Sequence, residues 1–236
     1  MSVDKVVIND LNPSALELAR FSGNINKVNN IEYSEEEICR FFSRYSKKGN
    51  RASIVDIDPF GSPAQFFDCG LRATMHGGIL SCTATDLQVL NGLFQNTCKR
   101  KYGGIPIRTK YGNEIAIRLI LGCLRSVSGR LGLEINPLFV ESNMHYYRIY
   151  VRVYNRPDQN ENLGYIIHCK NCAHRKLVKE KTECCELCGC QNNIGGPLWN
   201  EKIFEGEFVE QMILKTSELN VHKTCEKSLQ KCLSES

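Results

Sequence analysis

Short apolar runs alternate with amphipathic segments along the first 154 residues, and this alternation limits the fold more than any other feature. Runs typical of β-strands lie at 5–8, 52–57 and 78–85. Apolar residues at helical spacing begin after Pro13 and recur in 34–46, 64–76 and 111–129. The alternation predicts a parallel, doubly wound α/β sheet. Two strand runs with a short link, 133–140 and 145–154, predict an antiparallel hairpin at one edge of that sheet.

The last predicted strand has two contrasting faces. Tyr146, Arg148, Tyr150, Arg152 and Tyr154 share one face, whereas the apolar residues between them share the other. We expect the apolar face to join the core. The Tyr–Arg face either supports a second domain, which we favour, or contacts a nucleic acid.

Composition narrows the class of protein. The chain has 236 residues, of which 42% are hydrophobic and 24% are charged, a profile that suits one sizeable core with a smaller appendage. The formal net charge is only +4, so affinity for nucleic acids has to come from local clusters. There is no apolar run of 18 residues and no signal-peptide pattern at the start, which argues against a membrane span and export.

The 13 cysteines are unevenly distributed. Because export is not expected, we interpret them as thiols or metal ligands rather than a disulfide framework. Single cysteines in the first part are expected to be buried and free: Cys39, Cys69, Cys82, Cys98 and Cys123. Six more fall between Cys169 and Cys190. This change, after the polar stretch NRPDQNENLG, predicts a core at 1–155, a second domain at 156–215 and a polar tail or frayed helix at 216–236.

Two Cys-x-x-Cys pairs in the second domain predict a zinc ribbon. Cys169 and Cys172 are separated from Cys185 and Cys188 by 12 residues, a spacing typical of a tetrahedral, structural Cys₄ site. Neighbouring residues compete for places in that site: Cys184, Cys190, His168 and His174.

The stretch IVDIDPFGSP, residues 54–63, ends a predicted strand on acidic residues and then stiffens the chain. Asp58-Pro59-Phe60 is similar to the Asp/Asn-Pro-Pro-aromatic motif of enzymes that methylate exocyclic amines of nucleobases. A carboxylate and an adjacent carbonyl can accept the amine N–H groups and localise its lone pair, proline fixes the carbonyl direction, and the aromatic ring can stack on the base. The plainer interpretation is a strand-to-turn junction.

Asp10 occupies a similar place after the run 5–8. Ligands of doubly wound sheets bind beyond the carboxyl ends of strands, where an acidic residue commonly accepts hydrogen bonds from ribose hydroxyls. The alternative is a solvated aspartate in a turn.

A basic stretch lies between Asp86 and Glu114, which has no acidic residue inside it. We expect a flexible loop there that grips RNA phosphates, or else a solvated loop. The residues that would contact RNA are Lys99, Arg100, Lys101, Arg108 and Lys110.

Five segments are distinctive when read together: DIDPFGSPAQFFDCGLRATMHGGILSCTATDLQVLNG, KYGGIPIRTKYGNEIAIRLILG, PLFVESNMHYYRIYVRVY, GGPLW and FEGEFV. From about Lys5 to Ile213, the chain closely resembles the tRNA (guanine-26-N2)-dimethyltransferase family of archaeal and eukaryotic type. The resemblance implies a Rossmann-like class I methyltransferase sheet. It also implies transfer of one or two methyl groups from S-adenosylmethionine to the N2 amine of guanine 26 in tRNA.

The resemblance also implies roles for individual residues. Asp58, with Pro59, matches the catalytic position, and Phe60 matches the aromatic that stacks on the base. Asp10 matches the carboxylate on the cofactor ribose, Glu35 is the best match near the adenine, and Asp56 is assigned to the cofactor as well. For zinc, the family favours Cys169, Cys172, Cys185 and Cys188. We expect tRNA as the partner, no membrane, a monomer, and an intracellular location in nucleus or cytoplasm.

The chain departs from the family at both ends. The family's first strand with its glycine-containing cofactor loop is not found, nor is the family's C-terminal extension, so we expect a fragment, a mis-started gene model or a pared-down protein. An unfilled position beside 5–8 and weak cofactor binding are then expected. Two alternative functions stay open: a catalytically impaired RNA-binding remnant, and an amine methyltransferase acting on DNA or protein.

Overall fold

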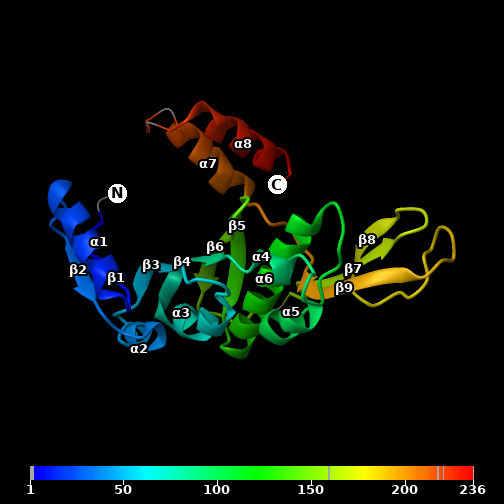
Figure 1. Cartoon of the computed structure of the whole chain (residues 1–236), viewed down its shortest axis with the longest axis horizontal. Helices are drawn as coiled ribbons and strands as arrows, with labels where there is room; N and C mark the ends of the chain where they lie inside the picture. The colour runs from blue at the N-terminus through cyan, green and yellow to red at the C-terminus, as the bar shows by residue number, and fades with distance from the viewer. Residues whose placement is uncertain (1–2, 159, 217, 220, 236) are drawn as a thin grey trace.

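The computed structural model describes residues 3–158, 160–216, 218–219 and 221–235. It is an α/β structure with a central mixed sheet, a small parallel pair of strands on one side and a three-stranded sheet on the other (Figure 1). None of the helices in this part of the chain is long and apolar enough to cross a bilayer.

The N-terminal unit consists of β1 (Val6–Asn9), α1 (Pro13–Ile25) and β2 (Ile31–Ser34), with β1 and β2 parallel. Helix α1 begins as predicted, because the Asn12 side chain accepts a hydrogen bond from the backbone of Ser14 and Pro13 occupies the first turn. The sequence did not indicate β2. The helix expected at 34–46 is shorter, α2 (Ile38–Ser43), because Glu37 caps it at its N-terminus.

The central sheet has the strand order β3-β4-β6-β5 (β3, Ala52–Ile57; β4, Thr74–Ala84; β5, Glu134–Ser142; β6, Tyr147–Tyr154). Strands β3 and β4 are parallel, and β6 is antiparallel to both β4 and β5. This confirms the α/β class and the terminal hairpin, but the central sheet is mixed rather than parallel, and the predicted strand 5–8 lies outside it. The segment expected as a helix at 64–76 is a short 3₁₀ turn (Ala64–Phe66) followed by α3 (Phe67–Ala73), and β4 begins earlier than predicted.

Within the described residues, β1 and β2 form a sheet of their own that has no hydrogen-bonded pairing with β3. The chain therefore has a break in strand pairing between β1 and β3 in its described part. A disulfide between Cys39 and Cys69 links α2 to α3, with 5.4 Å between their Cα atoms. The expectation that both cysteines are free was wrong, because two helices that the sequence separates by 30 residues place these side chains together.

The core lies between the central sheet and α6 (Gly112–Arg130), whose buried residues run along most of its length. Strand β6 alternates between buried and half-buried residues over its whole length, as its sequence predicted. Two short helices, α4 (Leu87–Leu90) and α5 (Gln95–Tyr102), lie in the region that was expected to be a flexible loop. Gly103, with φ of 75°, ends α5 in the left-handed conformation that favours glycine.

The second sheet has the order β8-β7-β9 (β7, Leu163–Cys169; β8, Arg175–Val178; β9, Asn192–Trp199) and all its strands are antiparallel. It is attached to the core through β9, which packs on α6. At Gly122 a side-chain Cβ would lie 2.9 Å from the Cα of Leu198, so the close approach requires glycine. Trp199 is buried at this junction and donates a hydrogen bond to the carbonyl of Lys202.

The C-terminal segment forms a helical hairpin of α7 (Gly206–Thr216) and α8 (Lys223–Ser234), seen in orange and red in Figure 1. Residues 216–236 were expected to be a polar tail or a frayed helix. Instead, α8 is a regular helix whose Leu229 is only 7% exposed, because its sparse apolar residues pack with Met212 and Ile213 of α7.

Candidate active site and metal centre

The loop that carries Asp58, Pro59 and Phe60 leaves the carboxyl end of β3 and is fixed to the end of β4. The backbone N–H of Gly61 donates to the hydroxyl of Thr85 (2.7 Å), and the N–H of Thr85 donates to the carbonyl of Gly61 (2.9 Å). Gly61 has φ of 89°, a conformation that a residue with a side chain rarely adopts. Sequence reasoning missed Thr85. Its signal was its position directly after the strand next to β3.

The loop presents its functional groups to solvent. The Asp58 side chain is 62% exposed, and Phe60 is fully exposed. Among the described residues, neither the Asp58 carboxylate nor the Pro59 carbonyl accepts a hydrogen bond. Both acceptors are thus free for a substrate, and the aromatic ring beside them has an open face.

A guanidinium group lies beside this loop. Arg148 of β6 donates to the carboxylate of Asp56 (2.6 Å) and to the hydroxyl of Thr83 (3.0 Å), and it lies 4.0 Å from the carboxylate of Asp58. Burial lowers the pKa of Arg148, but the charge of Asp56 and the ring of Tyr150 raise it, and the net direction is upward. The guanidinium therefore stays charged.

We favoured a role for the Tyr–Arg face of β6 in supporting the second domain, but the hydrogen bonds of its two arginines are with the central sheet. Its arginines turn toward β3 and β4 instead: Arg148 contacts Asp56, and Arg152 donates to the carbonyl of Gly77 (3.1 Å). The reason is that β4 and β6 are hydrogen-bonded neighbours, which the sequence pattern of β6 alone does not reveal.

Asp10 and Glu35 lie next to each other at the carboxyl ends of β1 and β2. The parallel register pairs Asn9 with Ser34, so the two residues that follow are opposite one another. Asp10 accepts a hydrogen bond from the backbone of Asn12 (2.8 Å) through one carboxylate oxygen. Acidic residues that follow two neighbouring parallel strands suit the hydroxyls and amine of a nucleoside.

The three glutamates after β2, residues 35–37, make different contacts. Glu36 is held by Arg44 (2.7 Å) and by the hydroxyl of Ser34, and Glu37 caps α2 through its backbone N–H groups. Two hydrogen bonds from the helix backbone lower the pKa of Glu37. Glu35 is exposed and has no such task, so it is the member of the run that can serve a ligand.

The predicted site residues therefore form two groups. Asp10 and Glu35 lie in the small parallel sheet, whereas Asp56, Asp58 and Phe60 lie at the end of β3 in the central sheet. Within the described residues, no hydrogen bond or ion pair joins one group to the other.

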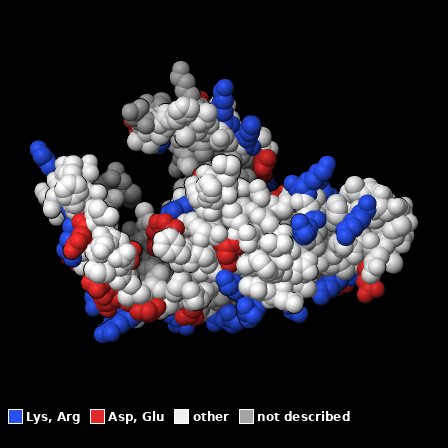
Figure 2. Space-filling view, in the orientation of Figure 1, with Lys and Arg blue, Asp and Glu red and all other residues white. Residues whose placement is uncertain are grey.

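The basic residues predicted to contact RNA lie on and after α5. Lys99 and Arg100 are exposed, whereas Lys101 pairs with Asp86 (3.1 Å). The remaining two, Arg108 and Lys110, are exposed in the segment that follows. Figure 2 shows Lys and Arg side chains gathered along the lower edge of the molecule, in the region of α5. The patch is more rigid than a flexible loop, because Tyr102 anchors α5 by donating to Asp86 (2.6 Å).

Four cysteines of the second sheet meet in one cluster: Cys169, Cys172, Cys185 and Cys188. Their sulfur atoms all lie within 4.8 Å of one another, and two pairs are 3.5 Å apart. A tetrahedral zinc ion with Zn–S bonds of about 2.3 Å needs sulfurs roughly 3.8 Å apart, so the donor set fits zinc. Hydrogen bonds from the backbone of Cys190 and from the Cys169 thiol lower the pKa of Cys188 to about 6, whereas the pKa of Cys172 in the same cluster is raised.

The alternatives left open by the sequence lie outside this cluster. Cys184 and Cys190 are exposed and are not among its members. The side chains of His168 and His174 are engaged elsewhere, with Tyr111 (2.8 Å) and Glu186 (3.1 Å) respectively.

Comparison with known proteins finds similar chains that are named tRNA dimethyltransferases. It is 34% identical over 243 residues to a tRNA (guanine(26)-N(2))-dimethyltransferase of Methanothermobacter thermautotrophicus, a match that covers 99% of this chain and 63% of the relative. It is 34% identical over 217 residues to a tRNA (guanine(26)-N(2)/guanine(27)-N(2))-dimethyltransferase of Aquifex aeolicus, covering 87% of this chain and 54% of the relative. The chain thus spans somewhat more than half the length of these relatives.

The fold agrees with that comparison. The structure of Trm1 from Pyrococcus horikoshii, solved with S-adenosyl-L-methionine, superposes with a TM-score of 0.82 at 23% identity, covering 98% of this chain and 64% of that one. The family model described as N2,N2-dimethylguanosine tRNA methyltransferase matches residues 1–236. The chain therefore belongs to the N2,N2-dimethylguanosine tRNA methyltransferase family.

Proposed function

We propose that this chain carries the methyl-transfer site of an S-adenosylmethionine-dependent tRNA methyltransferase that acts on the N2 amine of guanine 26. The family model and the relatives named above support this activity. The observation that carries the proposal is the exposed Asp58-Pro59-Phe60 loop, whose two free acceptors lie beside an open aromatic face.

The loop suits the chemistry of an aromatic amine. The lone pair of the guanine amine is delocalised into the ring, which makes the nitrogen a poor nucleophile. Asp58 and the Pro59 carbonyl accept its two N–H groups and draw the lone pair onto nitrogen, while Phe60 stacks on the base, a contact worth roughly 1–3 kcal/mol. Bound S-adenosylmethionine would supply the methyl group to this nitrogen and keep the electron pair of the broken C–S bond on its sulfur, and Asp58 would accept the proton that the amine loses.

The cofactor is assigned to the small parallel sheet. When bound, S-adenosylmethionine supplies an electrophilic methyl carbon. Asp10 would bind the ribose hydroxyls, and Glu35 would lie on the adenosine side. We also expected Asp56 to contact the cofactor, but its carboxylate accepts a hydrogen bond from Arg148. Zinc in the four-cysteine cluster would serve folding rather than chemistry, because protein thiolates fill all four positions.

The partner is tRNA, which the exposed cations on and after α5 would contact through its phosphates. Such an enzyme works inside the cell, in the nucleus or the cytoplasm, and we propose that it acts as a monomer.

Methyl transfer from labelled S-adenosylmethionine to tRNA tests the proposal. Asp58→Ala is expected to lower the rate at least about a hundredfold, because positioning of the amine is lost. Asp68→Asn is the matched control, since Asp68 is an exposed aspartate of similar exposure that pairs with Arg72 on α3. Equal rates in the wild type and Asp58→Ala would refute the proposed role of the loop.

A second candidate is an RNA-binding protein without efficient catalysis. The break between β1–β2 and β3 favours it, because the cofactor carboxylates and Asp58 lie in separate sheets. Titration of the chain with S-adenosylmethionine separates the two: saturable binding that Asp10→Asn weakens supports the enzyme, whereas tRNA binding without cofactor binding supports the second candidate. Transfer to DNA or protein in place of tRNA would identify a different substrate.

A further inference from the structure

We propose that Arg148 is a positioning residue of the methyl-transfer site and that Asp56 is its anchor. The inference rests on the proposed function, because it assigns a task to the neighbours of Asp58. Arg148 belongs to β6, Asp56 and Asp58 to the end of β3, and the strand between them is β4.

Distance explains why the bridging residue is an arginine. Neighbouring strands lie about 4.8 Å apart, so a side chain of β6 has to extend across roughly 10 Å to meet a carboxylate of β3. Arg148 does so by passing over β4, where it donates to the hydroxyl of Thr83 (3.0 Å). Thr83 is the register partner of Arg148, so the guanidinium is guided along its path.

Charge explains what the bridge does. Asp56 and Asp58 are two residues apart and both carboxylates approach the Arg148 guanidinium, so these two negative charges lie near each other and repel. Arg148 donates to the first (2.6 Å) and lies 4.0 Å from the second. The first contact fixes the guanidinium, and the second places a positive charge next to the carboxylate that receives the amine. Asp58 is thereby held in place without losing its free acceptor positions.

Burial indicates that the guanidinium is held in a defined position. The Arg148 side chain is 21% exposed, whereas Asp58 is 62% exposed. Its Nε atom is buried and has no hydrogen-bond partner among the described residues, and the guanidinium lies 5.5 Å from the centre of the Tyr150 ring. The Arg148 guanidinium is therefore held by its other hydrogen bonds. The shortest of them is the one to the Asp56 carboxylate.

Arg152 provides the matched control. It lies two residues away on the same face of β6, but its guanidinium donates to the carbonyl of Gly77. Arg148→Gln and Arg152→Gln therefore remove equal charge from the same face. We expect Arg148→Gln to lower kcat by about ten- to a hundredfold, as a small misplacement of a catalytic group does, with KM for S-adenosylmethionine unchanged. Arg152→Gln should leave both constants within about twofold of the wild type.

Conservative replacement distinguishes positioning from general support of the fold. Arg148→Lys keeps the charge but loses the forked donors, so it should recover part of the lost kcat. Asp56→Asn removes the anchor and should lower kcat with KM for S-adenosylmethionine unchanged. The double variant Asp56→Asn/Arg148→Gln should be no slower than the slower single variant, because both act through one contact.

Three results would overturn the inference: a kcat of Arg148→Gln equal to that of Arg152→Gln, rate losses that multiply in the double variant, or a higher KM for S-adenosylmethionine in Asp56→Asn alone. The Tm of each variant is measured alongside the kinetics. Positioning is also refuted if Arg148→Lys restores no activity and the rate losses parallel the losses in Tm. Failure of the proposed function looks different, because Asp58→Ala would then be as active as the wild type.

Discussion

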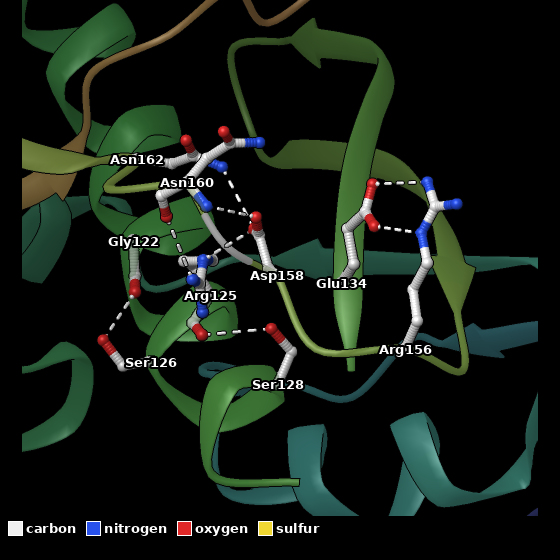
Figure 3. A network of polar contacts seen from close by, with 9 residues as sticks. All are labelled: Gly122, Arg125, Ser126, Ser128, Glu134, Arg156, Asp158, Asn160 and Asn162. Carbon is white, nitrogen blue, oxygen red and sulfur yellow. Dashed lines mark hydrogen bonds and ion pairs between the residues drawn. The ribbon is translucent and has the colours of Figure 1, made fainter. Parts of the chain in front are cut away.

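The segment that leads from β6 into the second sheet is fixed by a buried ion pair, and its removal gives a sharp prediction. Arg125 of α6 contacts Asp158 (3.0 Å), whose side chain is 1% exposed (Figure 3). The same carboxylate accepts hydrogen bonds from the backbone of Asn160 (2.9 Å) and the side chain of Asn162 (3.1 Å). Asp158→Ala removes all three contacts and leaves the cation of Arg125 uncompensated.

The expected cost follows from burial. Removing one partner of a buried pair typically costs 3–5 kcal/mol, and because Arg125 is 14% exposed we take the lower end, about 3 kcal/mol. For a chain of this size, that corresponds to a fall in Tm of about 6–12 °C. Replacing both partners, as in Arg125→Met/Asp158→Ala, should recover much of the loss, because no charge is then left buried.

Glu134→Ala is the control, since Glu134 pairs with Arg156 beside the first pair in Figure 3. Arg156 is 62% exposed, so solvent screens this pair and its loss should destabilise the chain much less than the loss of the buried pair. Urea and thermal unfolding, followed by circular dichroism, measure both variants. If Asp158→Ala destabilises the chain no more than Glu134→Ala does, the reasoning from burial is refuted.

Two further predictions concern the metal and the loop. Purified chain should contain about one zinc ion. Cys172→Ser should lose the ion and expose the second sheet to proteolysis, whereas Cys184→Ser, which lies outside the cluster, should keep it. Equal zinc content in the two variants would contradict the assignment. Thr85→Val removes the acceptor of the Gly61 N–H, a hydrogen bond worth about 1 kcal/mol, so the rate of methyl transfer should fall several-fold. The control Thr216→Val on α7 should keep a rate near that of the wild type. An unchanged rate in Thr85→Val would show that this hydrogen bond does not fix the loop.

The sequence was sufficient for features that depend on local pattern. Strand–helix alternation predicted the central sheet, and the short link before β6 predicted its hairpin. The exposure of Asp58 follows from its place after a strand. The spacing of the cysteines identified the cluster, while the structure decided among neighbours such as Cys184 and Cys190.

Features that depend on distant partners could not be predicted. Cys39 and Cys69 meet because two helices pack together, and Arg148 reaches Asp56 across an intervening strand. Asp158 lies in a polar stretch that resembles a linker. Its side chain is nevertheless almost completely buried, because it forms an ion pair with Arg125. Strand β2 is short and mixed in polarity, so its residues form a strand only because β1 lies beside them.

Mass analysis of nucleosides from tRNA incubated with the chain and S-adenosylmethionine tests the central claim most directly. The account predicts N2-methylguanosine and N2,N2-dimethylguanosine at position 26, formed by the wild type and absent with Asp58→Ala. Methyl groups on another atom or nucleoside, or the same products from Asp58→Ala, would contradict it.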